Sequence, residues 1–207
     1  TIDNLRSKYL NYINESDKKK YENNLKTILN QINQIENLVN EFSDFARMPK
    51  PLFTKNNLIE LIKSNVNLLQ KIDPTIQINL KLSDVKNLSI ICDYEQISRV
   101  FFNLIKNSIE SIQEKAIKTE PFDKIIDIEI VRRKDYIIIE ITDNGLGFTS
   151  NKIKDLIKPY FTTKEKGSGL GLSIVNKIIS DHNGSINFNS QKKGAKVKII
   201  LPINYVV

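Results

Sequence analysis

The sequence predicts an α+β fold in which helices cover one face of a mixed β-sheet, with a helical hairpin in front of it. Three observations favour this fold. The first 50 residues repeat apolar side chains at helical spacing, a pair of prolines at 49–51 interrupts the helix, and beyond it helical periods alternate with strand-like runs. We therefore expect two domains, a helical hairpin at 1–50 and a sandwich domain at 51–207.

Composition excludes several kinds of protein. Of the 207 residues 40% are hydrophobic and 27% are charged, as in an ordinary soluble domain. The net charge of +7 is scattered and no recognition motif accompanies it, so we expect no nucleic-acid partner. The one cysteine, Cys92, rules out an internal disulfide and a cysteine-based metal site, and its apolar neighbours predict a small core residue. No apolar run is long enough to cross a membrane, so we expect any membrane contact through segments absent from this chain.

A heptad seam dominates the first domain. From Tyr21 to Phe42 apolar residues recur at alternating spacings of four and three, which is typical of a helix packed lengthwise against other helices. A shorter repeat precedes it, and Ser16 or Asp17 is the predicted cap between the two helices. One hairpin cannot cover its own seam, so we expect a homodimeric bundle; the alternative is packing against the domain that follows. The seam consists of Tyr21, Leu25, Ile28, Ile32, Ile35, Val39 and Phe42, and the shorter repeat of Ile2, Leu5, Tyr9 and Tyr12.

The second domain alternates between helix and strand patterns. Apolar residues at helical spacing predict helices at 57–70, 94–116 and 170–181. Alternating or apolar runs bounded by turn residues predict strands at 75–82, 124–132, 136–142, 184–189 and 195–201. Tight hairpins among the strands indicate a mixed sheet with the helices on one face.

Gly167, Gly169 and Gly171 stand at alternate positions in a chain that has only seven glycines. The segment lacks the lysine of a Walker phosphate loop, and no strand leads directly into it as a dinucleotide fingerprint requires. A helix that begins at about Gly169 would offer N–H groups and its dipole to an anion. Taken alone, these residues leave a phosphate site and a structural turn equally open.

Two further patches carry chemistry. Asp143 follows a predicted strand, and its carboxylate could accept a hydrogen bond from an exocyclic amine while Gly145 and Gly147 let a flat base lie against the backbone. Asn103 and Asn107 lie one turn apart on a predicted helix, where neutral carbonyl oxygens suit Mg²⁺. Taken singly, the first patch could be an acidic turn and the second a surface pair.

In their order along the chain, these segments resemble the motifs of the GHKL superfamily of ATP-binding domains, and within it the sensor histidine kinases. Residues 103–107 resemble the N box, 143–147 the G1 box, 159–164 the F box and 167–172 the G2 box. The end of the hairpin, 41–51, is similar to nitrogen-regulation kinases of the NtrY type. The resemblance implies a Bergerat-type α/β sandwich and a protein histidine kinase that uses ATP and Mg²⁺.

The resemblance also implies a role for each matching residue. Asn107 would hold the Mg²⁺ that bridges the ATP phosphates, with Asn103 in support, and Asp143 would bind the adenine amino group. Gly145 and Gly147 would make room for the base. Residues 148–168 would form a mobile lid whose charges assist phosphoryl transfer. The implied lid and phosphate residues are Phe161, Thr163, Lys164, Lys166, Gly167, Ser168, Gly169, Leu170, Gly171 and Leu172.

The sequence departs from the family's pattern at two positions. Its single histidine, His182, precedes an Asn-Gly turn at a predicted helix end, which favours a structural role over that of phosphoacceptor. We therefore expect a fragment that begins after the phosphoacceptor box, binds ATP and does not phosphorylate itself. Glu110 stands where many histidine kinases have a basic residue, so more of the phosphate binding would fall to Lys164 and Lys166.

Two other functions stay open at this point. A hydrolysing ATPase of the same superfamily would have a glutamate as general base where Asn103 stands, and a non-catalytic dimeric module would only sense ATP. The intact motif residues favour a kinase. For a kinase, the resemblance implies the receiver domain of an NtrX-like response regulator as partner, and a cytoplasmic catalytic part of a protein anchored in the bacterial inner membrane.

Overall fold

The computed structural model describes residues 4, 8–9, 12–83, 88–148, 150–164 and 167–204. The chain divides into two compact units, which are described separately here: residues 1–48 with 164–168, and residues 49–163 with 169–207. Among the helices of the described residues, none combines the length and the apolar character that a membrane span needs.

The first unit contains one long helix, α2 (Glu15–Ala46), of 32 residues. The predicted cap at Ser16 or Asp17 is wrong, because Asn14 has extended backbone (φ −59°, ψ 147°) and its carbonyl accepts the first helical hydrogen bonds. The helix ends ahead of Pro49, as expected, since proline disfavours helical geometry in the residue before it.

Most of the predicted heptad seam is exposed within the chain. Leu25 is buried at 8% exposure, whereas Ile35 and Val39 are 64% and 55% exposed. Exposed apolar residues gathered in this way are typical of contact surfaces. Ile2 and Leu5 of the shorter repeat lie outside the described residues, so the first arm of the hairpin stays a prediction.

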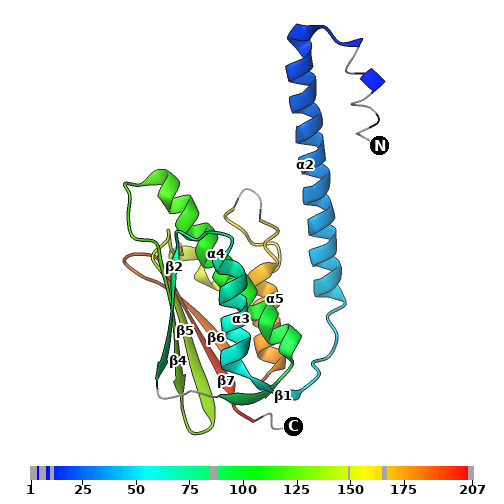
Figure 1. Cartoon of the computed structure of the whole chain (residues 1–207). Helices are drawn as coiled ribbons and strands as arrows, with labels where there is room; N and C mark the ends of the chain where they lie inside the picture. Colours follow the sequence, from blue (N-terminus) through cyan, green and yellow to red (C-terminus); the bar gives the residue numbers. More distant parts are fainter. Residues whose placement is uncertain are drawn as a thin grey trace. The chain divides into compact units, whose positions relative to one another are not determined.

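The second unit has three helices on one face of its sheet, α3 (Leu58–Gln70), α4 (Tyr94–Lys118) and α5 (Gly171–Asp181) (Figure 1). The first two begin at side-chain caps: Asn57 accepts from the N–H groups of Ile59 and Glu60, and Asp93 accepts from that of Gln96. A short 3₁₀ helix, η2 (Ser150–Asp155), precedes α5. The predicted helices are therefore confirmed, with α4 two residues longer than expected.

The main sheet has the strand order β2-β4-β5-β7-β6. β2 and β4 are parallel and the other neighbours are antiparallel, so the predicted mixed sheet is confirmed. Its strands are β2 (Gln77–Ser83), β4 (Ile125–Arg132), β5 (Tyr136–Asp143), β6 (Ser185–Ser190) and β7 (Ala195–Pro202). A separate antiparallel pair, β1 (Thr54–Asn57) with β3 (Ser89–Cys92), was not predicted.

The core lies between the helices and the sheet. Ile128 is paired with Ile141 and Ile130 with Ile139 across β4 and β5, and all four side chains are buried. Cys92 is buried too, which confirms it as a core residue, and desolvation raises the pKa of its thiol to about 11.

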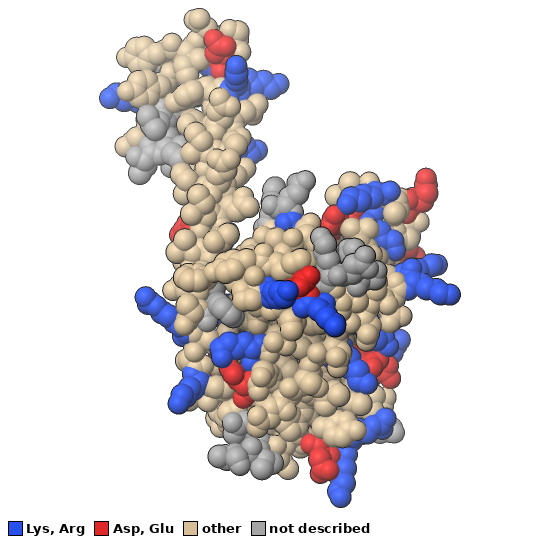
Figure 2. All heavy atoms as spheres, turned by 180° about the vertical axis from the view of Figure 1, so that it is seen from behind, with Lys and Arg blue, Asp and Glu red and all other residues tan. Residues whose placement is uncertain are grey.

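The opposite face of the sheet is polar. Lys196 pairs with Glu140 at 2.7 Å and Lys81 with Asp127 at 3.1 Å. On the face that Figure 2 shows, Lys and Arg side chains are scattered among acidic ones rather than gathered in one patch. This distribution agrees with the dispersed charge of the sequence.

Candidate functional site

Helix α4 is the platform of the site. Asn103 and Asn107 are half-buried and lie one helical turn apart, on the same side of the helix. Lys106 pairs with Glu110 at 3.9 Å on the adjoining, more exposed flank. The asparagines therefore belong to a partly covered face, and not to a fully exposed surface pair.

Asp143 is the last residue of β5 and lies between β4 and β7, level with Ile126 and Ala195. It is only 6% exposed. Its Oδ1 accepts from the backbone N–H groups of Gly145 at 2.9 Å and Ala195 at 3.3 Å, and its Oδ2 accepts from the Ser108 hydroxyl at 3.2 Å. Burial raises the pKa of the Asp143 carboxyl, while these three donors and the charge of Lys115 act in the opposite direction. The result is a buried carboxylate held at the end of the sheet.

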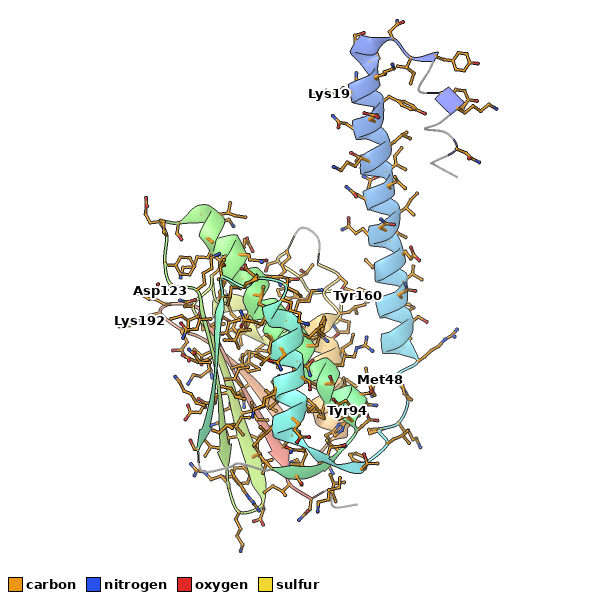
Figure 3. The ribbon with its side chains drawn as sticks, in the orientation of Figure 1. Lys19, Met48, Tyr94, Asp123, Tyr160 and Lys192 are labelled. Carbon is orange, nitrogen blue, oxygen red and sulfur yellow. The ribbon has the colours of Figure 1, made fainter. Side chains whose placement is uncertain are left out.

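The loop after β5 is fastened on both sides. Asn144 Oδ1 accepts from the N–H of Ile125 at 3.0 Å, and its amide nitrogen donates to the carbonyl of Asp123. On the other side, Lys115 donates to the Asn144 carbonyl, and Ser111 Oγ accepts from the N–H of Leu146 at 3.0 Å. Figure 3 shows Asp123 and, from the β6–β7 turn, Lys192 at the same end of the sheet. The loop is thus held between α4 and the neighbouring strands.

A glycine at 145 lets this loop touch the helix. A Cβ there would lie 2.8 Å from the backbone carbon of Ser111 and 2.9 Å from the nitrogen of Ile112, closer than real side chains come. Gly147, with φ 79°, lies against the carbonyl of Gly194 in the β6–β7 turn. At both glycines the loop packs closely against protein, and the approach of a base to this backbone stays a prediction.

The glycine-rich segment enters helix α5 later than expected. Helix α5 begins at Gly171, and not at about Gly169, because Gly169 has φ 72° and cannot be part of a right-handed helix. A Cβ on Gly169 would lie 2.5 Å from the carbonyl carbon of Tyr160 and 2.8 Å from the nitrogen of Phe161. Leu170, fully buried, is the capping residue.

The first turn of α5 lies beside Asn103. The Cβ position of Gly171 is 3.7 Å from Asn103 Oδ1, with no closer neighbour among the described atoms. The N–H groups of this first turn, including those of Gly171 and Leu172, have no carbonyl one turn before them in the helix. An amide oxygen and a helix N-terminus are therefore side by side, which suits a phosphate together with its cation.

The remaining predicted residues are not all brought to this site. Phe161 is half-buried next to Gly169, and Thr163 is exposed. Lys164, Gly167 and Ser168 belong to the other compact unit, and Lys166 lies outside the described residues. Their roles at the phosphates stay predictions. Sequence reasoning missed Ser108, Ser111 and Lys115, although the polar spacing along one side of α4 could have indicated the two serines.

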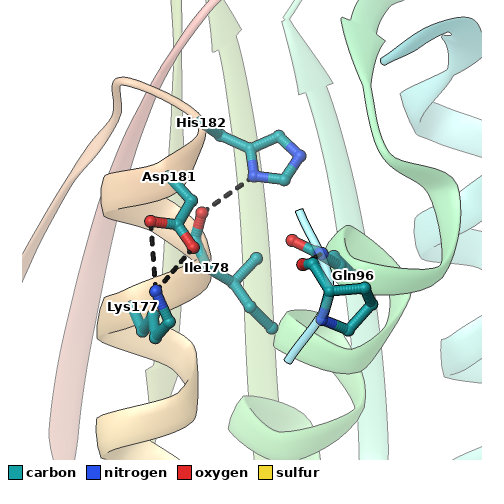
Figure 4. A network of polar contacts seen from close by, with 6 residues as sticks. Gln96, Lys177, Ile178, Asp181 and His182 are labelled. Carbon is teal, nitrogen blue, oxygen red and sulfur yellow. Dashed lines mark hydrogen bonds and ion pairs between the residues drawn. The ribbon is translucent and has the colours of Figure 1, made fainter. Parts of the chain in front are cut away.

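His182 has the structural role predicted for it. It caps the C-terminus of α5, is 2% exposed and packs edge-on against Phe53, with ring centroids 5.1 Å apart. Its Nδ1 donates to the carbonyl of Ile178 at 2.8 Å (Figure 4), and its Nε2 accepts from the N–H of Asp93 at 3.0 Å. Burial lowers the pKa of the imidazole. Both ring nitrogens are engaged, and the ring joins the end of α5 to the start of α4.

Comparisons with known proteins identify the family of the chain. Residues 92–205 match the family described as "Histidine kinase-, DNA gyrase B-, and HSP90-like ATPase". An NtrY-like sensor histidine kinase of Rickettsia conorii is 37% identical over 180 residues, which are 86% of this chain and 29% of that protein. The chain thus spans less than a third of this curated relative.

Solved structures of histidine kinases have the same fold. The nucleotide-free catalytic domain of the histidine kinase ThkA covers 74% of this chain and 99% of its own, with 28% identity and a TM-score of 0.64. ThkA in complex with the response regulator protein TrrA covers 98% of this chain and 58% of its own, with 22% identity and a TM-score of 0.70. The chain therefore belongs to the family of histidine kinase-, DNA gyrase B- and HSP90-like ATPases, whose ATP-binding catalytic domain it carries, and within that family it is similar to the NtrY-like sensor histidine kinases.

Proposed function

We propose that this chain binds Mg²⁺-ATP at the site around α4, and that the full-length protein transfers the γ-phosphoryl group of that ATP to a histidine. The observation that carries the proposal is the convergence of segments that are far apart in the sequence. Ser108, the residue directly after the N-box segment, donates a hydrogen bond to Asp143, and Gly171 of the G2-box segment lies beside Asn103. These contacts join the three segments that resemble the N, G1 and G2 boxes of the family.

At the adenine end, the Asp143 carboxylate accepts from the amino group of the base. Two backbone N–H groups occupy its Oδ1, so Oδ2 is the oxygen on which the amine would bind. The carboxylate is buried and fixed before the nucleotide arrives, which reduces the entropy lost on binding. Gly145 and Gly147 let the loop pack against α4 and the β6–β7 turn, and the resemblance implies that they also make room for the base.

At the phosphate end, the residues fit a Mg²⁺ ion that is bound together with phosphates. Asn107 would supply a neutral amide oxygen, and Asn103 would support it from one turn away, next to the N-terminus of α5. Mg²⁺ usually takes one or two protein oxygens and completes its shell with phosphate oxygens and water. When bound, it would neutralise charge that develops on the phosphates. Thr163, Lys164, Gly167 and Ser168 would complete the phosphate site from the lid.

The site favours transfer over hydrolysis. Hydrolysis needs a general base near the attacking water, and the amide of Asn103 cannot take up a proton. Positioning and charge stabilisation are sufficient for phosphoryl transfer to a nucleophile that another part of the protein supplies.

In the full-length protein, the phosphoryl group would pass from ATP to a histidine and then to an aspartate of a response regulator, of the NtrX type. The likeness to NtrY-like kinases and the ThkA–TrrA complex support this partner. The exposed seam of α2 supports a homodimer, because apolar residues such as Ile35 need a partner surface. We place this catalytic part in the cytoplasm, with an inner-membrane anchor elsewhere in the full-length protein.

The test is calorimetric titration of the chain with Mg²⁺-ADP. We expect saturable binding in the wild type and at least about tenfold weaker binding in Asp143→Asn, which is the loss expected when a charged acceptor is removed. Asp127→Asn is the matched control, because Asp127 lies on β4, on the opposite face of the sheet, where it pairs with Lys81. Wild-type protein that binds no Mg²⁺-ADP, or equal affinities in the two variants, would contradict the proposal.

A further inference from the structure

Two serines of α4 hold the loop after β5 in chemically different ways. Ser108 is buried and donates its hydroxyl hydrogen to Asp143 Oδ2 at 3.2 Å. Ser111, one turn further along the helix, accepts a backbone N–H from Leu146 at 3.0 Å. Ser108 therefore acts on the carboxylate itself, and Ser111 acts only on the loop backbone.

The hydrogen bonds divide the two oxygens of Asp143 between different tasks. The N–H groups of Gly145 and Ala195 approach Oδ1 at 2.9 and 3.3 Å, and they fix this oxygen from the backbone side. The Ser108 hydroxyl donates to Oδ2 from α4 and constrains the rotation of the carboxylate together with the two backbone donors. A carboxylate oxygen can accept more than one hydrogen bond, so Oδ2 can bind a further donor while Ser108 holds it.

We propose that Ser108 is a positioning residue for base selection: it presents Asp143 Oδ2 as an acceptor, so that a 6-aminopurine binds and a 6-oxopurine is rejected. This inference rests on the proposed ATP site. An amine at position 6 donates to the fixed oxygen. A carbonyl at that position would place two acceptor oxygens against each other in a buried site, and the unpaired acceptors would weaken binding.

The electrostatics of the site are consistent with this role. Burial favours the protonated carboxyl of Asp143, in which one oxygen would carry a hydrogen and donate instead of accept. The Ser108 hydroxyl, the two backbone donors and the ammonium group of Lys115 favour the charged form, which only accepts. The Glu140–Lys196 pair lies on the other face of the sheet, away from this carboxylate.

The experiment measures the affinities of the full chain for Mg²⁺-ADP and Mg²⁺-IDP, which differ at position 6 of the purine, in the wild type, Ser108→Ala and Ser111→Ala. The wild type should prefer ADP. In Ser108→Ala we expect ADP to bind about tenfold more weakly and IDP to change less than about twofold, so that the preference falls. Ser111→Ala is the matched control: it should change both affinities by the same factor and leave the preference intact.

The outcomes separate this inference from the proposed function. If the wild type binds neither nucleotide, the ATP site itself is refuted. If the wild type prefers ADP and Ser108→Ala retains that preference, or lowers both affinities equally, Ser108 has a merely structural role and the inference is overturned. A preference lost equally in Ser111→Ala would also overturn it.

Discussion

Replacing His182 by leucine should destabilise the second unit and remove one component of its pH dependence. The Nε2 of this buried ring accepts from the N–H of Asp93, and leucine would leave that N–H without its acceptor. The carbonyl of Ile178 loses the ring N–H but keeps the backbone N–H of residue 182 at 3.1 Å. The cost is therefore that of one orphaned buried donor, about 1–3 kcal/mol.

The pH dependence follows from the pKa of the same ring. Burial lowers the pKa of His182 below its ordinary value of 6.5, so the native state resists a proton that the unfolded state accepts. The contribution of this group to the free energy of unfolding is fully present above pH 6.5 and is lost as the pH falls below that value. If the native ring stays neutral throughout, the free energy of unfolding falls by about 1.4 kcal/mol between pH 7.5 and 5.5, because only the unfolded chain takes up a proton there. Since the chain has one histidine, no other imidazole contributes.

Urea unfolding followed by near-ultraviolet circular dichroism, at pH 7.5 and 5.5, measures both effects. The wild type should lose up to about 1.4 kcal/mol at the lower pH. His182→Leu should start about 1–3 kcal/mol lower at pH 7.5 and lose much less on acidification. Equal losses in the two proteins between pH 7.5 and 5.5 would refute the assignment of this titration to His182.

Three further predictions concern other parts of the chain. Gly169→Ala should destabilise the protein by about 1–3 kcal/mol, because residue 169 has φ 72° and an added Cβ would press on Tyr160. Gly171→Ala is the control and should change the melting temperature little; equal melting temperatures of the two variants would contradict this prediction. Incubation with γ-labelled ATP should leave His182 unlabelled, because both ring nitrogens are bonded inside the protein; acid-labile label on this residue would contradict its structural role. In sedimentation experiments the wild type should be dimeric and Ile35→Asp monomeric, because burying a carboxylate in an apolar interface costs free energy. A wild type that is monomeric at every concentration would exclude the dimer.

Much of the fold could be predicted because its signals are local. Helix α3 has apolar residues at helical spacing, and the alternating isoleucines of β4 and β5 specify which side of each strand faces the core. The pair β1–β3 could not be predicted in this way. The sequence of β1 is Thr-Lys-Asn-Asn, which has no apolar alternation, and it is a strand because β3 pairs with it from a distant part of the chain.

Some residues of the candidate site could also be predicted from the sequence, and others could not. Asp143, Asn103 and Asn107 were predicted as site residues because chemically distinctive residues occur there in a recognisable order. Ser108 and Ser111 are ordinary helix residues in the sequence, and they acquire a role only when the sheet brings the loop after β5 against α4. The expectation that a helix begins at about Gly169 was wrong because Gly169 has a left-handed backbone, φ 72°, which a glycine in the sequence permits but does not specify.

The most direct test of the ATP site is a crystal structure of the chain with Mg²⁺ and a non-hydrolysable ATP analogue. We expect the adenine amino nitrogen at hydrogen-bond distance, about 3 Å, from Asp143 Oδ2, and the Asn107 amide oxygen on the Mg²⁺ ion. A nucleotide bound away from α4, or an adenine whose amino group does not contact Asp143, would contradict the account.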